Sequence, residues 1–109
     1  MAWGSYQQSY AYNYDINSVF DAVMRTASQL KLKLCDSDRN AYRVQFSNGI
    51  SLFTWGEKLN VSMGVLPDGR TGITIASVSN LGCELAAKSK NEGNVFKFVN
   101  TLNMFLPPR

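Results

Sequence analysis

The sequence predicts an α+β domain, with an antiparallel sheet of five to six strands and two helices packed on one face of that sheet. From residue 31 to residue 78, apolar and polar residues alternate in short runs separated by turn signals. Such alternation is typical of antiparallel strands with one buried face. An apolar stripe with helical spacing lies on each side of this region. Packing both stripes against the same sheet face is the economical arrangement.

The chain has 109 residues, of which 45% are apolar and 17% charged. This length suits one domain that can bury its own core, and this composition excludes global disorder. We expect residues 1–8 to be a flexible lead-in and residues 9–109 to form the single domain. Cys35 and Cys83 lack metal-type spacing and are expected to be buried thiols in a reducing cytoplasm. No apolar run is long enough for a membrane span, so a cytoplasmic location is predicted.

The first elements are a strand over Ser9–Tyr14, which can be an edge strand, and a helix over residues 15–30. The tyrosines of this strand alternate with small or polar residues. Asp15 suits the helix N-cap, because its carboxylate can accept free backbone N–H groups. The helix carries one apolar stripe, formed by Ile16, Val19, Phe20, Val23, Met24, Ala27 and Leu30.

Alternation predicts further strands over residues 31–36, 42–47, 50–55, 59–66 and 71–78. Asn48-Gly49 is a strong hairpin signal that would join residues 42–47 to residues 50–55. Residues 80–93 are expected to form a long irregular connection. A second helix would then start at an Asn91 N-cap and end at Pro107-Pro108.

The sequence contains few features that would indicate catalytic activity or a bound cofactor. The chain has no histidine, which excludes a Ser-His-Asp arrangement and His-containing metal sites. No glycine-rich loop has the form that cradles phosphate. The net charge is +3 with cations spread along the chain, so nucleic-acid binding is not expected. We expect a non-catalytic protein without cofactor or metal.

Two groups of residues are candidate sites. Phe53 and Trp55 would lie near Arg43, Gln45 and Lys58 on the open sheet face, where they could bind a partner. The alternative is that this strand faces the other way, or that Trp55 packs under a loop. The second candidate is a cavity between the last helix and the sheet, and its alternative is an ordinary packed core. Its lining would comprise Met63, Val65, Ile73, Phe96, Val99, Leu102 and Met104, with Met63, Phe96, Val99 and Leu102 as its main residues.

The run Ser51-Leu52-Phe53-Thr54-Trp55-Gly56-Glu57 resembles a Ser-Leu-Phe-Ser-Trp-Gly-Glu pattern in a group of small uncharacterised bacterial domains. The late helix with Gly93-Asn94-Val95-Phe96-Lys97-Phe98 is part of the resemblance. Lys90, Asn91, Glu92 and Gly93 loosely match the Gly-Lys-Asn start of the last helix in that group. The order of elements also resembles helix-grip and TATA-binding-protein-like α+β domains. The resemblance implies a fold and no known activity.

Two functions follow as hypotheses. The first is a binding module that holds a small apolar ligand or lipid between the C-terminal helix and the sheet, as the helix-grip resemblance implies. The alternative is a protein-interaction or self-associating domain that uses the open sheet face or the edge strand at Tyr10–Tyr14.

Overall fold

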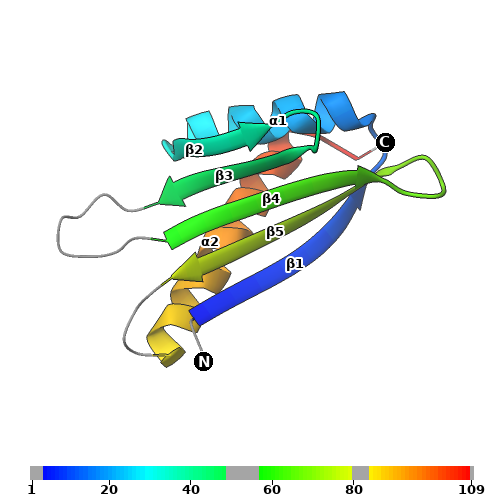
Figure 1. Cartoon of the computed structure of the whole chain (residues 1–109). Helices are drawn as coiled ribbons and strands as arrows, with labels where there is room; N and C mark the ends of the chain where they lie inside the picture. Colours follow the sequence, from blue (N-terminus) through cyan, green and yellow to red (C-terminus); the bar gives the residue numbers. More distant parts are fainter. Residues whose placement is uncertain (1–3, 49–56, 80–83, 109) are drawn as a thin grey trace.

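The structure is a computed structural model that describes residues 4–48, 57–79 and 84–108. The elements in chain order are β1 (Gly4–Tyr12), α1 (Ile16–Gln29), β2 (Lys33–Asp38), β3 (Arg43–Asn48), β4 (Glu57–Val65), β5 (Thr71–Ser79) and α2 (Glu84–Phe105). The described strands form one five-stranded antiparallel sheet in the order β1-β5-β4-β3-β2. Figure 1 shows both helices on the same side of the sheet. The predicted fold class is confirmed.

Helix α1 begins as its sequence predicts. Asp15 is the N-cap, and its carboxylate accepts a hydrogen bond from the backbone N–H of Ser18 at 3.2 Å. The predicted stripe faces the sheet, since Val19, Phe20 and Val23 are buried. Local capping and apolar spacing therefore define this helix before any tertiary contact is considered.

Strand β1 begins at Gly4 and ends at Tyr12, so the expected bounds of Ser9–Tyr14 are wrong. Residues 4–8, expected in a flexible lead-in, pair with β5 in a register that starts at Gly4 opposite Ser79. Their alternation was hard to see because a polar residue, Gln8, stands between Tyr6 and Tyr10 on the same face. Backbone pairing with β5 does not need an apolar side chain at that position.

The predicted hairpin between residues 42–47 and residues 50–55 is wrong. Strand β3 lies between β2 and β4, with Asn48 opposite Glu57, so both of its edges are occupied. The pairing of β3 with β4 matches apolar residues on the helix side, with Phe46 opposite Leu59. Asn48 ends β3, but the local turn signal did not identify the partner strand. The expected strand at residues 50–55 lies outside the described residues.

Helix α2 begins at Glu84, so the irregular connection expected over residues 80–93 is wrong from residue 84 onward. Asn91 lies inside the helix and is not its N-cap. The sequence from Glu84 to Lys90 is rich in good helix formers, Glu, Leu, Ala and Lys, and the single Gly93 is tolerated in the helix. Residues 80–83 lie outside the described part of the chain.

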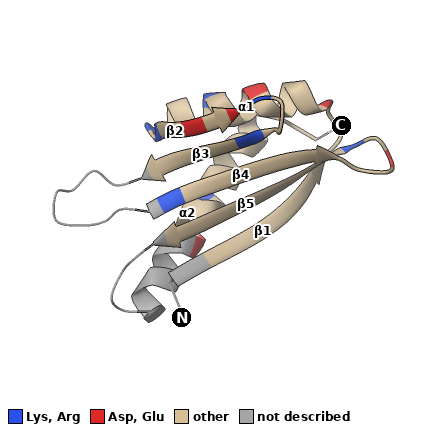
Figure 2. Ribbon diagram, in the orientation of Figure 1, with Lys and Arg blue, Asp and Glu red and all other residues tan. Residues whose placement is uncertain are grey.

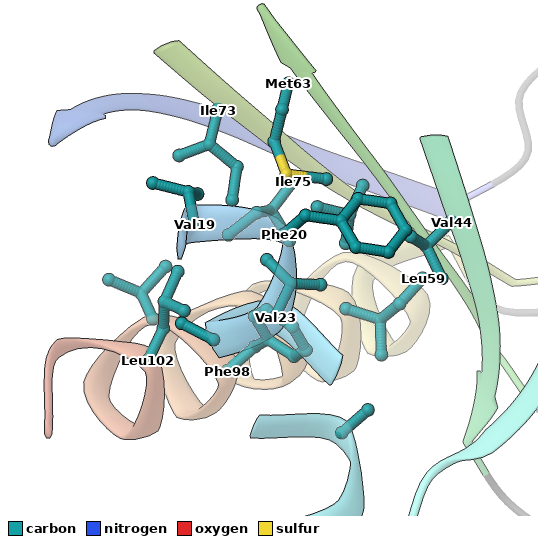
Figure 3. Close-up of a cluster of buried hydrophobic side chains, with 14 of the residues drawn as sticks. Val19, Phe20, Val23, Val44, Leu59, Met63, Ile73, Ile75, Phe98 and Leu102 are labelled. Atoms are coloured by element: carbon teal, nitrogen blue, oxygen red, sulfur yellow. The ribbon is translucent and has the colours of Figure 1, made fainter. Parts of the chain in front are cut away.

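The core lies between the helices and the sheet, and side chains from α1, α2 and the central strands converge there in Figure 3. Phe98 of α2 is fully buried and packs against Phe46 of β3, with ring centroids 6.1 Å apart. The largest fully buried side chains are Phe46, Phe98, Leu59, Ile73, Ile75, Leu102, Val19, Val23, Val61 and Val95.

Phe98→Ala is expected to lower the free energy of unfolding by about 3–5 kcal/mol, because it leaves a cavity between α2 and the sheet. Met104→Ala is the matched control on the same helix, since Met104 is 76% exposed. It should change the free energy by less than about 0.5 kcal/mol. Urea unfolding measures both, and equal losses would contradict the packing described above.

Candidate binding surfaces

The open face of the sheet carries a hollow of about 510 Å³. Alternate residues of β3, β4 and β5 point away from the helices, and no described element covers them (Figure 1). The hollow is lined by Gln7, Asp36, Asp38, Arg43, Val44, Gln45, Asn60, Val61, Ser62, Thr74 and Ala76. This surface is therefore mainly polar, in contrast to the apolar helix side.

The open face presents both acidic and basic side chains. Asp38 and Arg43 are opposite each other across β2 and β3. Asp38 Oδ1 accepts the backbone N–H groups of Asn40 and Ala41, each at 3.0 Å, and so closes the β2–β3 turn. Among the described residues, no carboxylate lies within ion-pair distance of the Arg43 guanidinium. The guanidinium is consequently available to a bound partner.

The structure places the predicted surface residues in different parts of the face. Arg43 is opposite Ser62, whereas Lys58 is opposite Ser47 at the other end of the β3–β4 pair. The Lys58 Nζ atom lies 3.7 Å from Cys35 Sγ, and Cys35 is exposed, so the expected burial of this thiol is wrong. Phe53 and Trp55 lie outside the described residues.

The sequence prediction placed Gln45 near the candidate surface but did not include the acids of the hollow, Asp36 and Asp38. Gln45 Nε2 donates to Asn60 Oδ1 at 2.8 Å, which links β3 and β4 on the open face. Gln45 lies two residues from Arg43, and the period of two in a strand places both residues on the same face, as predicted. The position of Asp36 could not be read in this way, because a register shift lies between Leu34 and Asp36.

The four main residues proposed to line a cavity differ in burial. Met63, Val99 and Leu102 belong to the buried core, with exposed fractions of 8%, 6% and 0%. Phe96 is 45% exposed and packs edge-to-face on Tyr6, with centroids 5.7 Å apart. Of the other proposed lining residues, Ile73 is buried, whereas Val65 and Met104 are exposed. In this part of the layer the described side chains form the packed core that was the alternative interpretation.

A small opening lies between the helices and the sheet, where α1 ends and β2 begins. It is lined by Leu30, Leu32, Leu59, Asn94, Lys97 and Phe98. Its volume is about 20 Å³, which is enough for one water molecule. Four of its six lining residues are leucine or phenylalanine, so its wall is mostly apolar.

One polar pair lies beside this opening. Ser77 is fully buried on the helix side of β5, opposite Leu59 of β4. Asn94 Nδ2 of α2 donates to Ser77 Oγ at 3.3 Å. The sequence contained the signal for this site, because Ser77 follows Ile73 and Ile75 at intervals of two and must face the core with them.

Two tyrosines connect β1 and the residues after it to α2 and the residues that follow α2. Tyr12 Oη donates to Asn103 Oδ1 at 2.7 Å, and Tyr14 Oη donates to the Pro107 carbonyl oxygen at 2.6 Å. Burial, with a smaller effect of Tyr10, raises the pKa of Tyr12 to about 12. These contacts border a pocket of about 380 Å³, which is also lined by Asn13 and Arg70.

The described residues contain no group of three or more Cys, Asp or Glu side chains placed to hold a metal ion. Within the same ranges, neither helix has the length and apolarity needed to cross a bilayer.

Solved structures of distant sequence share this fold. A structural-genomics protein from Nitrosospira multiformis matches with a TM-score of 0.67 and 11% identity, covering 94% of this chain and 95% of that chain. Ara h 8.0201 matches with a TM-score of 0.65 and 8% identity, covering 96% and 99% respectively. The di-domain ARO/CYC BexL from the BE-7585A biosynthetic pathway has a TM-score of 0.57 and 9% identity, covering 98% and 51%.

At these identities the likeness establishes the fold alone, and it agrees with the expected small α+β domain. No protein-family model matches the sequence, and no curated protein matches it.

The raised pKa of Tyr12 makes a pH-dependent prediction. The folded protein binds the phenol proton more tightly than the unfolded chain, whose tyrosine pKa is near the ordinary value of 10.0. The contribution of Tyr12 to stability is therefore complete below pH 10 and is lost as the pH rises from 10 toward 12. Tyr12→Phe should show a smaller loss of stability over this range in urea unfolding. Identical pH dependence in both proteins would contradict the assignment.

Proposed function

We propose that this chain is a non-catalytic binding module that holds a small apolar molecule with one polar end between α2 and the sheet. The observation that carries the proposal is the Ser77–Asn94 pair, buried beside the apolar opening at the end of α1. The site lies toward the N-terminal half of α2, and it is displaced from the cavity that the sequence predicted around Met63 and Leu102.

The chemistry of the opening matches an amphipathic ligand. Burying a hydroxyl and an amide in an apolar layer is unfavourable unless they find partners. Ser77 and Asn94 bond to each other at 3.3 Å, and each has a further partner besides this bond. A polar end group would have to replace the bond between them, while Leu59 and Phe98 contact the apolar part. Lys97 at the rim favours an acidic end group.

The volume of about 20 Å³ means that a ligand must separate α2 from the turn at Leu30–Leu32. Opening the layer has a free-energy cost, which reduces the apparent affinity. The fold shared with the ARO/CYC protein BexL supports the class of small-molecule binding by analogy only. The proposal includes no reaction, since the rim offers an amide and an ammonium group and the chain has no histidine.

An anilinonaphthalene sulfonate probe, which is apolar with one acidic group, tests this proposal by fluorescence titration. We expect saturable binding, weakened by about tenfold in Lys97→Glu, which corresponds to about 1.4 kcal/mol. Leu32→Asn should weaken binding as well, because it makes the apolar wall polar.

Val65→Asn is the matched control, since Val65 is 64% exposed on β4 and does not line the opening. Circular dichroism must show that each variant is folded, because loosely folded proteins also bind this probe. Non-saturable binding, or equal affinity in all variants, would sink the proposal.

A second candidate function is recognition of a partner protein on the open sheet face. The hollow of about 510 Å³ and the uncovered Arg43 favour it. Such a face can bind a partner through the polar side chains at its rim and through the exposed backbone of the strands between them.

This candidate predicts that Arg43→Glu abolishes capture of a specific protein from a lysate. Lys31→Glu makes the same change in charge at an exposed site away from the hollow and should leave capture intact. Capture of the same proteins by wild type and Arg43→Glu would contradict a role for the hollow.

A further inference from the structure

The two edges of the sheet differ in chemistry. Strand β2 carries Lys33, Asp36 and Asp38, and its pairing with β3 is interrupted by a bulge. Strand β1 has nine residues, none of them charged or proline, and its register with β5 is unbroken. In Figure 2 the described part of β1 has neither blue nor red segments.

Edge strands expose unpaired backbone N–H and C=O groups, so natural sheets protect them with charges, proline or bulges. Strand β2 has two of these protections and β1 has none. Figure 1 shows β1 at the margin of the sheet with no described element beyond it. The backbone groups on that side of β1 are therefore able to pair with another strand.

The helix surface above β1 carries one aromatic and two amide side chains. Phe96, Asn100 and Asn103 lie at i, i+4 and i+7 on α2, so they share one face of the helix. Phe96 contacts Tyr6, and Asn103 accepts the hydroxyl of Tyr12, so this face lies over β1. Phe96 remains 45% exposed. A strand that pairs with β1 would lie next to the exposed ring of Phe96 and extend the sheet on that side.

We propose that β1 pairs in antiparallel fashion with β1 of a second copy of this chain, joining the two sheets into one. Gln8 is the midpoint of Gly4–Tyr12, so a two-fold axis at Gln8 lets the whole strand pair. This register places Tyr6 opposite the partner's Tyr10, and Gln7 opposite the partner's Ser9.

The strand is complementary to itself in this register. Cross-strand aromatic pairs stabilise antiparallel strands, and the Tyr6–Tyr10 pair occurs twice because of the symmetry. No like charges meet at any position of the strand. A foreign peptide could pair with the same edge, but β1 needs no partner of different chemistry, and a second copy is always present.

Gln8 is exposed, and its substitution tests the two-fold axis. By sedimentation and light scattering, wild type should have twice the mass of Gln8→Lys and of Gln8→Glu, since each variant brings like charges together. An equimolar mixture of the two variants should recover the dimer mass, because Lys and Glu then meet across the axis. Ser37→Lys on β2 is the matched control at the other edge and should remain dimeric.

Gln8→Cys, in a Cys35→Ser and Cys83→Ser background, should form a disulfide-linked dimer under mild oxidation. Opposed residues in antiparallel strands have Cα atoms roughly 4.5–5.5 Å apart, which suits a disulfide. Ser9→Cys should not link, because its counterpart across the axis is out of register.

A wild-type protein that stays monomeric up to its solubility limit would overturn the proposal. So would a dimer that survives in Gln8→Lys, or monomeric variants that fail to associate when mixed. A wild-type monomer that binds a peptide along β1 would assign the edge to a foreign strand.

Discussion

The burial of one sheet face by α2 is the contact on which the rest of the structure depends. Phe98 and Leu102 of α2 are fully buried, and Phe98 packs against Phe46 of β3. A sheet with one apolar face must pack that face against another element, because exposing it to water is unfavourable. Helix α1 adds Val19 and Val23 to the same layer. The open face then carries polar side chains. The strand order is the one that brings the apolar faces of the strands together under the helices.

This one-sided burial separates the candidate sites. The helix side supplies apolar walls, and the Ser77–Asn94 pair is the polar feature beside its small opening. The open face supplies charges and amides around a hollow. The margin at β1 supplies unpaired backbone groups on a strand without charged residues. Each surface suits a different type of partner, since apolar contact, polar side chains and backbone pairing are distinct modes of recognition.

Much of the fold could be predicted from local patterns. The cap at Asp15 and the apolar stripe behind it predicted α1, and the alternation of Val44 with Phe46 predicted β3. The predictions were wrong where local signals were weak or ambiguous. Gln8 concealed the first half of β1, and Asn48-Gly49 indicated a turn without identifying the strand that pairs with β3. The good helix formers between Glu84 and Lys90 extend α2 past the cap signal at Asn91.

The sequence by itself determined the fold class, α1 and the absence of histidine chemistry, because these depend on composition and on periods within a few residues. Only the tertiary structure decided that Met63, Val99 and Leu102 fill the core while Phe96 is exposed beside Tyr6. Tertiary structure also brought Asn94 to Ser77, 17 residues apart in the chain, and placed β1 at an edge. These facts depend on which elements become neighbours, and neighbours are selected by the joint packing of all apolar faces.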